Sequence, residues 1–148
     1  AVRADLALAS LFGGLALANA GLGAVHGFAA PAGGMFEAPH GAACAALLPA
    51  VVRVNVRALL ERAPDSPALA RYREVASIVT GRAADVEAAV AWIADLVRAL
   101  GVPGLARWGA GEADVPALVA KARAASSMKG NPIALEEAEL EEIARASL

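Results

Sequence analysis

The sequence predicts an all-α fold, a multi-helix bundle of about six to eight helices. Three observations carry this prediction. Apolar residues recur at steps of three and four along most of the chain, which is the spacing of one helix face. No stretch of convincing length alternates apolar and polar residues as a half-buried strand does. Clusters of proline and glycine divide the chain into segments of helical length.

The first apolar segment, Leu6–Phe36, carries no formally charged side chain. It exceeds the run of about 18 apolar residues that marks a membrane-spanning helix. Because it consists mainly of Ala and Gly and contains Asn19 and His26, we expect a central helix buried on all sides rather than a membrane span. We predict a first helix over Arg3–Asn19, with Leu22–Ala29 as its continuation or as a second short helix.

The elements that follow are marked by proline and glycine. Pro31–Ala38 holds several turn formers and is predicted to be a loop. His40–Arg62 then forms a long amphipathic helix, since the proline directly before it suits the start of a helix. The next predicted helix, Pro67–Thr80, begins after Ser66, a good N-cap residue, and ends at Gly81.

The second half of the chain continues the helical pattern. Asp85–Leu100 is the clearest helix, because its apolar residues recur at steps of three and four. Leu105–Glu112 is irregular, and Asp114 is predicted to cap a helix that runs to about Ala125. Met128–Pro132 is a predicted turn, and the last helix spans Glu137–Ala146 with acidic residues in its first turns.

Composition and charge exclude several classes of protein. The 148 residues fit one domain with a packed core, and the 58% hydrophobic content excludes disorder. A single cysteine, Cys44, allows neither an internal disulfide nor a zinc-finger pattern. The net charge of -2, the scattered basic residues and the 4% aromatic content argue against a nucleic-acid partner. The first residues do not show the basic segment, short apolar run and cleavage site of a signal peptide, so we expect none and a cytoplasmic location.

The chain has only two histidines, His26 and His40. Pro31 and Pro39 lie between them, so we expect the two side chains to come from different elements joined by a tight loop that can bring them together. The uncharged surroundings indicate buried, neutral imidazoles, the form that binds a divalent metal. Spacing alone leaves open the alternative of two unrelated buried histidines, each hydrogen-bonded to backbone groups.

The residues around the two histidines resemble the metal-site signature of the iron-containing (group III) alcohol dehydrogenases. The segments that carry this resemblance are Asn19–Gly27, Gly33–Phe36, Pro39–Gly41 and Ala46–Pro49. It continues through Ala113–Pro116, Ala125–Met128, Gly130–Pro132 and the pair Glu139-Leu140, and so covers essentially the whole chain.

The resemblance implies the C-terminal helical domain of an oxidoreductase with a dehydroquinate synthase-like fold. In that family an N-terminal domain binds NAD or NADP, and one Asp and three His hold an iron or zinc ion in the cleft between the domains. His26 and His40 match the last two of those ligands. The resemblance therefore implies Fe(II) or Zn(II), which polarises the oxygen of a small alcohol or aldehyde during hydride transfer.

Residues 1–148 are expected to form a single helical domain that is a fragment, because the chain begins at Ala1 almost inside a helix. The upstream nucleotide-binding domain, with the Asp and the first His, would then be a missing partner. Without it we expect weak metal binding and no turnover by the isolated chain. An apolar face is expected where that domain docks, and such a face would allow a homodimer.

Four further residues bear on the site. Ala30 stands where many members of the family carry another His, so the role of that His cannot be carried over. Leu17 matches a position that lines the substrate pocket, and its aliphatic side chain favours a small apolar substrate. Cys44, four residues after His40, is either a third metal ligand or a small buried hydrophobe. Glu37 is either a loop ligand or a solvated carboxylate.

Two other functions remain open at this point. The chain could be a non-catalytic helical domain, kept as a structural or interaction module after loss of the cofactor domain. It could also belong to a relative such as glycerol dehydrogenase or maleylacetate reductase. The pair His26-Gly27 and the triplet Pro39-His40-Gly41 favour the alcohol dehydrogenase version over these relatives.

Overall fold

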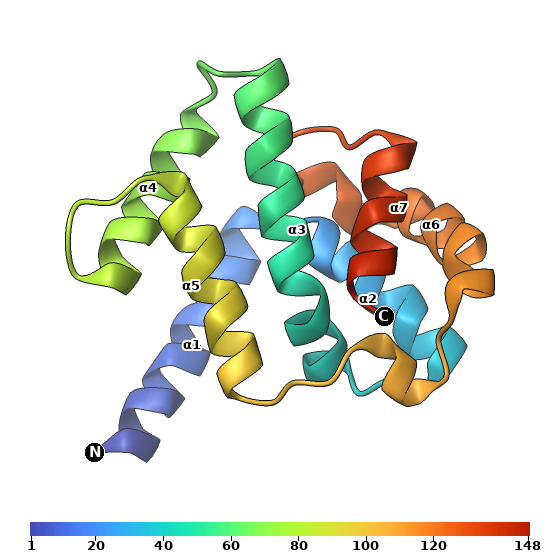
Figure 1. Ribbon diagram of the computed structural model, residues 1–148. Helices are drawn as coiled ribbons and strands as arrows, with labels where there is room; N and C mark the ends of the chain where they lie inside the picture. The colour runs from blue at the N-terminus through green and yellow to red at the C-terminus, as the bar shows by residue number, and fades with distance from the viewer.

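The computed structural model describes residues 1–148 and contains helices but no strand (Figure 1). The all-α prediction is confirmed, and the seven α-helices fall within the predicted number. They are α1 (Val2–Ala20), α2 (Ala24–Phe36), α3 (His40–Arg62), α4 (Pro67–Thr80), α5 (Val86–Ala99), α6 (Val115–Ala124) and α7 (Glu137–Ala146). Short 3-10 helices cover Leu105–Trp108, Glu112–Asp114 and Ser126–Gly130.

Helix α3 is the centre of the bundle, and it packs against α2, α4, α5 and α7 (Figure 1). Its buried residues belong to two apolar clusters. Leu47, Val51 and Val54 join the larger cluster with residues of α2, α6 and α7. Val56 and Leu59 join a smaller cluster with residues of α4 and α5. Because one helix contributes to both clusters, the two sides of the molecule are held as one unit.

Residues next to the helix ends determine where α4 begins and ends and where α5 begins. The Ser66 hydroxyl accepts the Ala68 N–H at 3.3 Å and caps α4 as predicted. The Asp85 carboxylate accepts the Ala88 N–H at 3.1 Å, so Asp85 caps α5 instead of being its first helical residue. Gly81 ends α4 in the left-handed conformation, with φ of 69°.

The predicted cap at Asp114 is wrong in detail. Its side chain makes no cap bond to α6, and its Oδ2 instead accepts the N–H of Gly111 at 2.9 Å. The residue thus closes the short 3-10 turn Glu112–Asp114 before α6 begins. Three residues of the predicted turn after α6, Met128–Gly130, likewise belong to a 3-10 helix.

The predicted loop over Pro31–Ala38 is mostly helix. Helix α2 continues through Pro31 to Phe36, although a proline cannot donate the backbone bond to the carbonyl of Gly27. Burial of Phe28 and Ala32 against the core stabilises the helix despite this lost bond. The turn is reduced to three residues that begin at Glu37, which is left-handed with φ of 56°.

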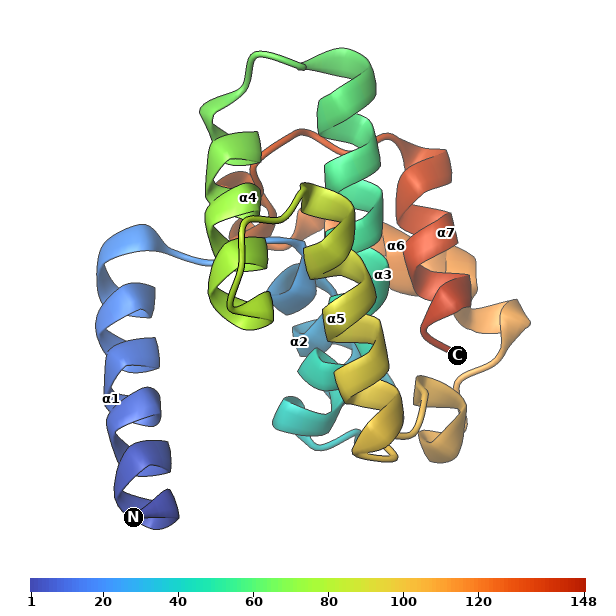
Figure 2. The same cartoon turned by 60° about the vertical axis from the view of Figure 1, so that its left-hand side comes forward.

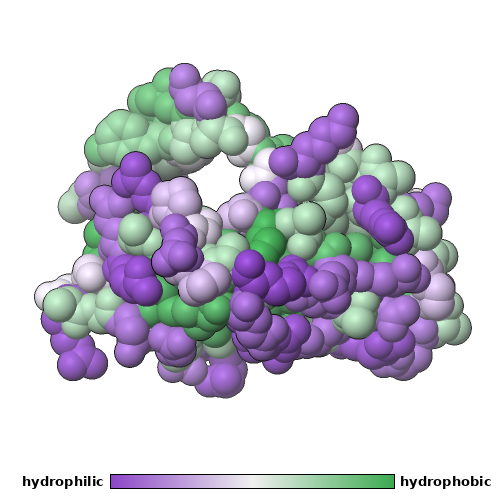
Figure 3. All heavy atoms as spheres, turned by 90° about the horizontal axis from the view of Figure 1, so that it is seen from above, coloured by the Kyte–Doolittle hydropathy of each residue, from purple (hydrophilic) through white to green (hydrophobic).

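The expectation of a buried first helix is wrong. Every residue of α1 is exposed, and the helix stands away from the bundle (Figure 2). In the space-filling view of Figure 3, an apolar arm projects from the molecule and an open gap separates it from the body, in agreement with the position of α1 in Figure 2. The chain turns at Gly21, where φ is 75°, and this turn directs α1 away from the core. By length and composition α1 and α3 could each cross a membrane, although α3 is a largely buried core helix.

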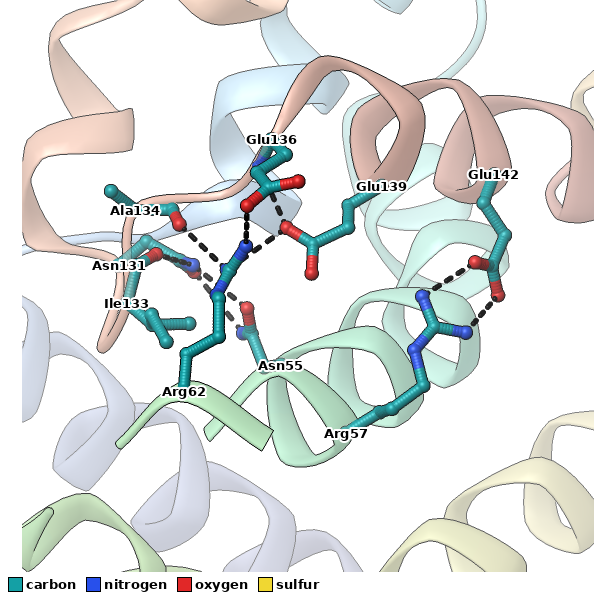
Figure 4. Close-up of polar contacts among 9 residues, drawn as sticks. All are labelled: Asn55, Arg57, Arg62, Asn131, Ile133, Ala134, Glu136, Glu139 and Glu142. Atoms are coloured by element: carbon teal, nitrogen blue, oxygen red, sulfur yellow. Dashed lines mark hydrogen bonds and ion pairs between the residues drawn. The ribbon is translucent and has the colours of Figure 1, made fainter. Parts of the chain in front are cut away.

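A pair of asparagine side chains joins α3 to the chain around residue 131 (Figure 4). The Asn55 amide donates to Asn131 Oδ1 at 3.1 Å, and the Asn131 amide donates back to Asn55 Oδ1 at 2.7 Å. Asn131 Oδ1 also accepts the N–H of Ala24, the first residue of α2, at 3.1 Å. Because Asn55 is 3% exposed, its amide has no access to bulk water when this pair is broken.

Ion pairs fasten α7 along the same helix (Figure 4). Arg57 binds both carboxylate oxygens of Glu142, at 3.1 and 2.6 Å. Arg62 contacts Glu136 at 2.6 Å and Glu139 at 3.0 Å, at the start of α7. The hydrogen bond from Arg57 lowers the pKa of the Glu142 carboxyl, so this carboxylate stays charged when the solution is moderately acidic.

The first prediction concerns the amide pair. We expect Asn55→Ala to lower the free energy of unfolding by about 1–3 kcal/mol, because it removes both bonds of the pair and leaves the half-buried Asn131 amide without its partner on α3. Urea unfolding followed by circular dichroism measures this loss. Asn19→Ala is the matched control, since Asn19 bonds only to the Leu15 carbonyl of its own exposed helix. Equal losses in the two variants would refute the role of the pair.

The second prediction concerns acid. The folded-state pKa of Glu142 is depressed, so its contribution to stability is present above the ordinary pKa of about 4.3 and is lost as the pH falls through the lower folded value. We expect the unfolding free energy of the unchanged chain to fall between pH 7 and pH 3. In Glu142→Gln this fall should be roughly 0.5–1 kcal/mol smaller, a small value because the ion pair is partly exposed to solvent. Glu74→Gln, in the exposed pair with Arg71, should change this fall much less.

Candidate metal centre

Two helix starts bring the two histidines together. His26 lies in the first turn of α2, and His40 is the first residue of α3. Their ring centroids are 5.3 Å apart, with the ring planes tilted by 48°. The prediction that the side chains come from different elements and meet is confirmed. The prediction that both are buried is wrong: His26 is half-buried, and His40 is exposed because it directly follows the short turn after α2.

The surroundings of His26 favour the uncharged ring. Burial lowers the pKa of the His26 imidazole, and the charge of a protonated His40 lowers it further. His26 therefore stays neutral over more of the physiological pH range than an exposed histidine does. A neutral ring has a free nitrogen lone pair, which is what a metal ion requires.

Cys44 lies beside the histidines, one helical turn after His40. Its Sγ is 3.6 Å from His40 Nε2, and one donor atom from each of the three residues lies within 4.8 Å of the other two. The side chain is half-buried rather than part of the buried core. Burial raises the pKa of the Cys44 thiol, so a metal that binds the sulfur must displace its proton.

The other candidates lie apart from this cluster. Glu37 is exposed at the end of α2 and does not belong to the group of donor atoms. Leu17 lies on the exposed face of α1 and lines a shallow hollow with Ser126 and Ser127, away from the histidines. Ala30, the position of a further His in the relatives described above, is exposed on α2.

A pocket of about 710 Å³ opens beside the cluster. His26 and Cys44 line one part of it, and Asn55, Tyr72 and Asn131 line another. Most of the remaining wall is apolar, which is typical of pockets that take a small organic molecule. The pocket therefore places candidate metal donors and hydrogen-bonding groups around one space.

Two glycines allow close packing next to this pocket. A Cβ on Gly130 would overlap the carbonyl oxygen of Leu22, so the segment after α6 can lie directly against the start of α2 only with glycine there. A Cβ on Gly27 would lie 2.9 Å from the Met128 side chain. These contacts pack the 3-10 helix Ser126–Gly130 against the element that carries His26.

The comparisons with known proteins agree with this arrangement. The model of the Fe-containing alcohol dehydrogenase family, C-terminal, matches residues 1–148. The chain belongs to the iron-containing alcohol dehydrogenase family. It is 38% identical over 144 residues to the 1,3-propanediol dehydrogenase of Klebsiella pneumoniae, covering 97% of this chain and 36% of that protein.

Two further similarities point to the same part of this family. The lactaldehyde reductase of Escherichia coli (strain K12) is 38% identical over 141 residues, covering 94% of this chain and 35% of that protein. A crystal structure of 1,3-propanediol oxidoreductase superposes with a TM-score of 0.76 at 32% identity, covering 95% of this chain and 36% of that one. The chain thus spans about 36% of the length of these relatives, and the resemblance found in the sequence is confirmed.

The iron-containing alcohol dehydrogenase family implies a metal ion and NAD(P), and the donor set here suits such a metal. Two imidazoles that meet from separate helices are typical ligands of borderline ions such as Fe(II) and Zn(II). Hard ions such as Mg²⁺ prefer oxygen donors, which the cluster lacks. The residues present therefore fit part of a coordination shell for an iron or zinc ion.

Sequence analysis missed two residues of the pocket wall. Tyr72 lies on α4, and its hydroxyl accepts a hydrogen bond from Asn55 at 3.4 Å. Asn131 was matched to a family segment but not assigned to the site. The available signal was Asn55 itself, because an amide on the apolar face of a core helix must find polar partners. The sequence could not show which partners it finds.

The third prediction tests the close backbone approach. We expect Gly130→Ala to lower the free energy of unfolding by about 1–3 kcal/mol, because the new methyl group forces Leu22 and the start of α2 to move. Gly34→Ala is the control, since its Cβ meets nothing within 4 Å. In a helix that exchange should stabilise by about 0.5–1 kcal/mol. Thermal unfolding should therefore move in opposite directions for the two variants.

Proposed function

We propose that this chain forms the metal-binding half of the active site of an NAD(P)-dependent alcohol dehydrogenase, with His26 and His40 as ligands. The observation that carries the proposal is the pairing of the two rings, 5.3 Å apart, beside a pocket of about 710 Å³. The whole-length match to the C-terminal part of the family supports it. The reaction interconverts a small alcohol and its aldehyde.

The chain's own residues have defined tasks in this reaction. His26 and His40 hold Fe(II) or Zn(II) through neutral imidazole nitrogens. When bound, the ion acts as a Lewis acid that stabilises negative charge on the substrate oxygen. Val51 and Val52, in the pocket wall, exclude water from the carbon side of the substrate.

Asn55 and Tyr72 give the pocket its polar groups. The Asn55 amide donates to the Tyr72 hydroxyl, which leaves the phenolic proton free to donate to a bound molecule. Burial raises the pKa of Tyr72, while the bond from Asn55 lowers it, and the raised net value keeps the hydroxyl protonated at neutral pH. The Tyr72 hydroxyl, held by Asn55, therefore orients a substrate or cofactor hydroxyl without carrying charge.

The partners of the proposed enzyme follow from its relatives. Those relatives are a 1,3-propanediol dehydrogenase and a lactaldehyde reductase, so we propose a small hydroxylated alcohol or aldehyde as substrate. NAD or NADP is bound mainly by an upstream nucleotide-binding domain, which also supplies the remaining metal ligands. Leu17 as a substrate contact, a cytoplasmic location and a homodimer belong to the same proposal.

The fourth prediction tests the two ligands. Calorimetric titration of the 148-residue chain with Zn(II), or with Fe(II) under anaerobic conditions, should show binding that either His26→Ala or His40→Ala weakens by more than about tenfold. Each substitution removes one of the imidazole donors, so the effects should be similar. Circular dichroism checks that the variants keep their helix content.

Glu37→Gln is the matched control, because it removes the nearest loop carboxylate without touching the histidines. We expect it to bind the metal as the unchanged chain does. If the double variant His26→Ala/His40→Ala binds as tightly as the unchanged chain, the proposed ligands are wrong. The chain would then be better described as a helical domain without a metal.

A further inference from the structure

The cluster at the start of α3 contains one donor that the proposed ligand pair does not use. Cys44 follows His40 by four residues on the same helix, so the two side chains lie on one face. Its sulfur is 3.6 Å from His40 Nε2. His26, from the other helix, completes a group in which all three donor atoms lie within 4.8 Å of one another.

The separation between Cys44 and His40 matches the edge of a tetrahedral coordination shell. A tetrahedral ion with metal–sulfur and metal–nitrogen bonds of about 2.3 and 2.0 Å holds the two donor atoms about 3.5 Å apart. The observed distance between Cys44 Sγ and His40 Nε2 is 3.6 Å. The longest separation in the group is at most 4.8 Å, so an ion shared by all three atoms requires these side chains to rotate toward it.

We propose that Cys44 is a third ligand of the metal, so that this chain alone supplies a His₂Cys donor set for a borderline or soft divalent ion. The proposal rests on the metal centre of the proposed function, and it adds a ligand to it. The sulfur in this set favours Zn(II) and Co(II) over harder ions such as Mn(II).

The binding step is a ligand exchange without electron transfer. The Cys44 S–H bond breaks, its proton passes to the buffer, and the sulfur electron pair forms the metal–sulfur bond. The two imidazoles donate nitrogen lone pairs, and in a buffer alkaline enough that both rings are already neutral they lose no proton. Bound water leaves the ion in return. In such a buffer one proton is released for each ion bound by the unchanged chain.

A purely structural role for the thiol makes a different prediction. The contact between Cys44 Sγ and His40 Nε2 can serve only as a weak hydrogen bond that orients the ring. In that case a serine hydroxyl at this position replaces the thiol, and metal binding changes little. A sulfur ligand, by contrast, leaves a spectroscopic signature that an oxygen does not.

The test uses Co(II) as a probe, because thiolate-to-cobalt charge transfer absorbs in the near ultraviolet. Cys44 is the only cysteine in the chain, so a band of this kind can come from no other residue. We expect the band to grow to one Co(II) per chain and to be absent from Cys44→Ser and Cys44→Ala. Circular dichroism establishes that both variants are folded.

Affinities give a second, independent readout. We expect Cys44→Ser to weaken Zn(II) binding by about 100-fold and Mn(II) binding by much less, because only the softer ion gains from the sulfur. Calorimetry in two buffers of different ionisation enthalpy should show one proton fewer released by Cys44→Ser. Glu37→Gln again serves as the unchanged control.

The outcomes separate this proposal from the proposed function. The role of Cys44 is overturned if no charge-transfer band appears and Cys44→Ser binds Zn(II) as tightly as the unchanged chain. If only the histidine variants lose Zn(II) affinity, the histidine pair remains supported. A band that persists in His26→Ala/His40→Ala overturns the three-residue site, because the thiolate then binds without the rings. Failure of the unchanged chain to bind any of these ions overturns both.

Discussion

The geometry of the candidate metal centre depends on the reciprocal amide pair between Asn55 and Asn131. The Asn131 oxygen also receives the first N–H of α2, so one side chain sets the distance between the middle of α3 and the start of α2. His26 follows that start by two residues. Only an amide can donate to and accept from an identical partner while accepting a third bond, so a carboxylate or an aliphatic residue at either position breaks the arrangement. The candidate ligands are therefore held by polar contacts outside their own cluster.

Helix α3 divides its length between two kinds of chemistry. From His40 to Val52 it carries no formally charged side chain, and this half faces α2 and the candidate metal centre. From Arg53 onward its arginines pair with the carboxylates of α7. The separation keeps fixed charges away from the two imidazoles, and it lets the charged half bind the C-terminal helix without perturbing them. A single continuous helix thus carries one residue of the candidate metal centre at its start and the ion pairs to α7 in its second half.

Those parts of the structure that depend on neighbouring residues could be predicted from the sequence, and those that depend on distant partners could not. Ser66 and Asp85 act through amides two or three residues away, so their helices begin where expected. Pro31 wrongly predicted a loop, because packing of α2 against the core outweighs the loss of the backbone hydrogen bond that a proline cannot donate. The meeting of the histidines was expected from the broken chain between them and from the resemblance to a family. Tyr72 could not be placed, since its position depends on how α4 packs against α3.

During synthesis on the ribosome, the two histidines emerge long before the residue that fixes their spacing. The contact that sets its geometry joins residues 76 positions apart, and the bond from Ala24 to the same side chain spans 107. Contacts between residues so far apart close slowly, and a chain still emerging from the ribosome cannot make them before residue 131 is available. The histidines therefore exist for most of synthesis on a chain that does not yet fix their spacing. If the proposed ligands bind a metal, its capture in a defined geometry is accordingly a late event, coupled to completion of the domain rather than to the appearance of the histidines.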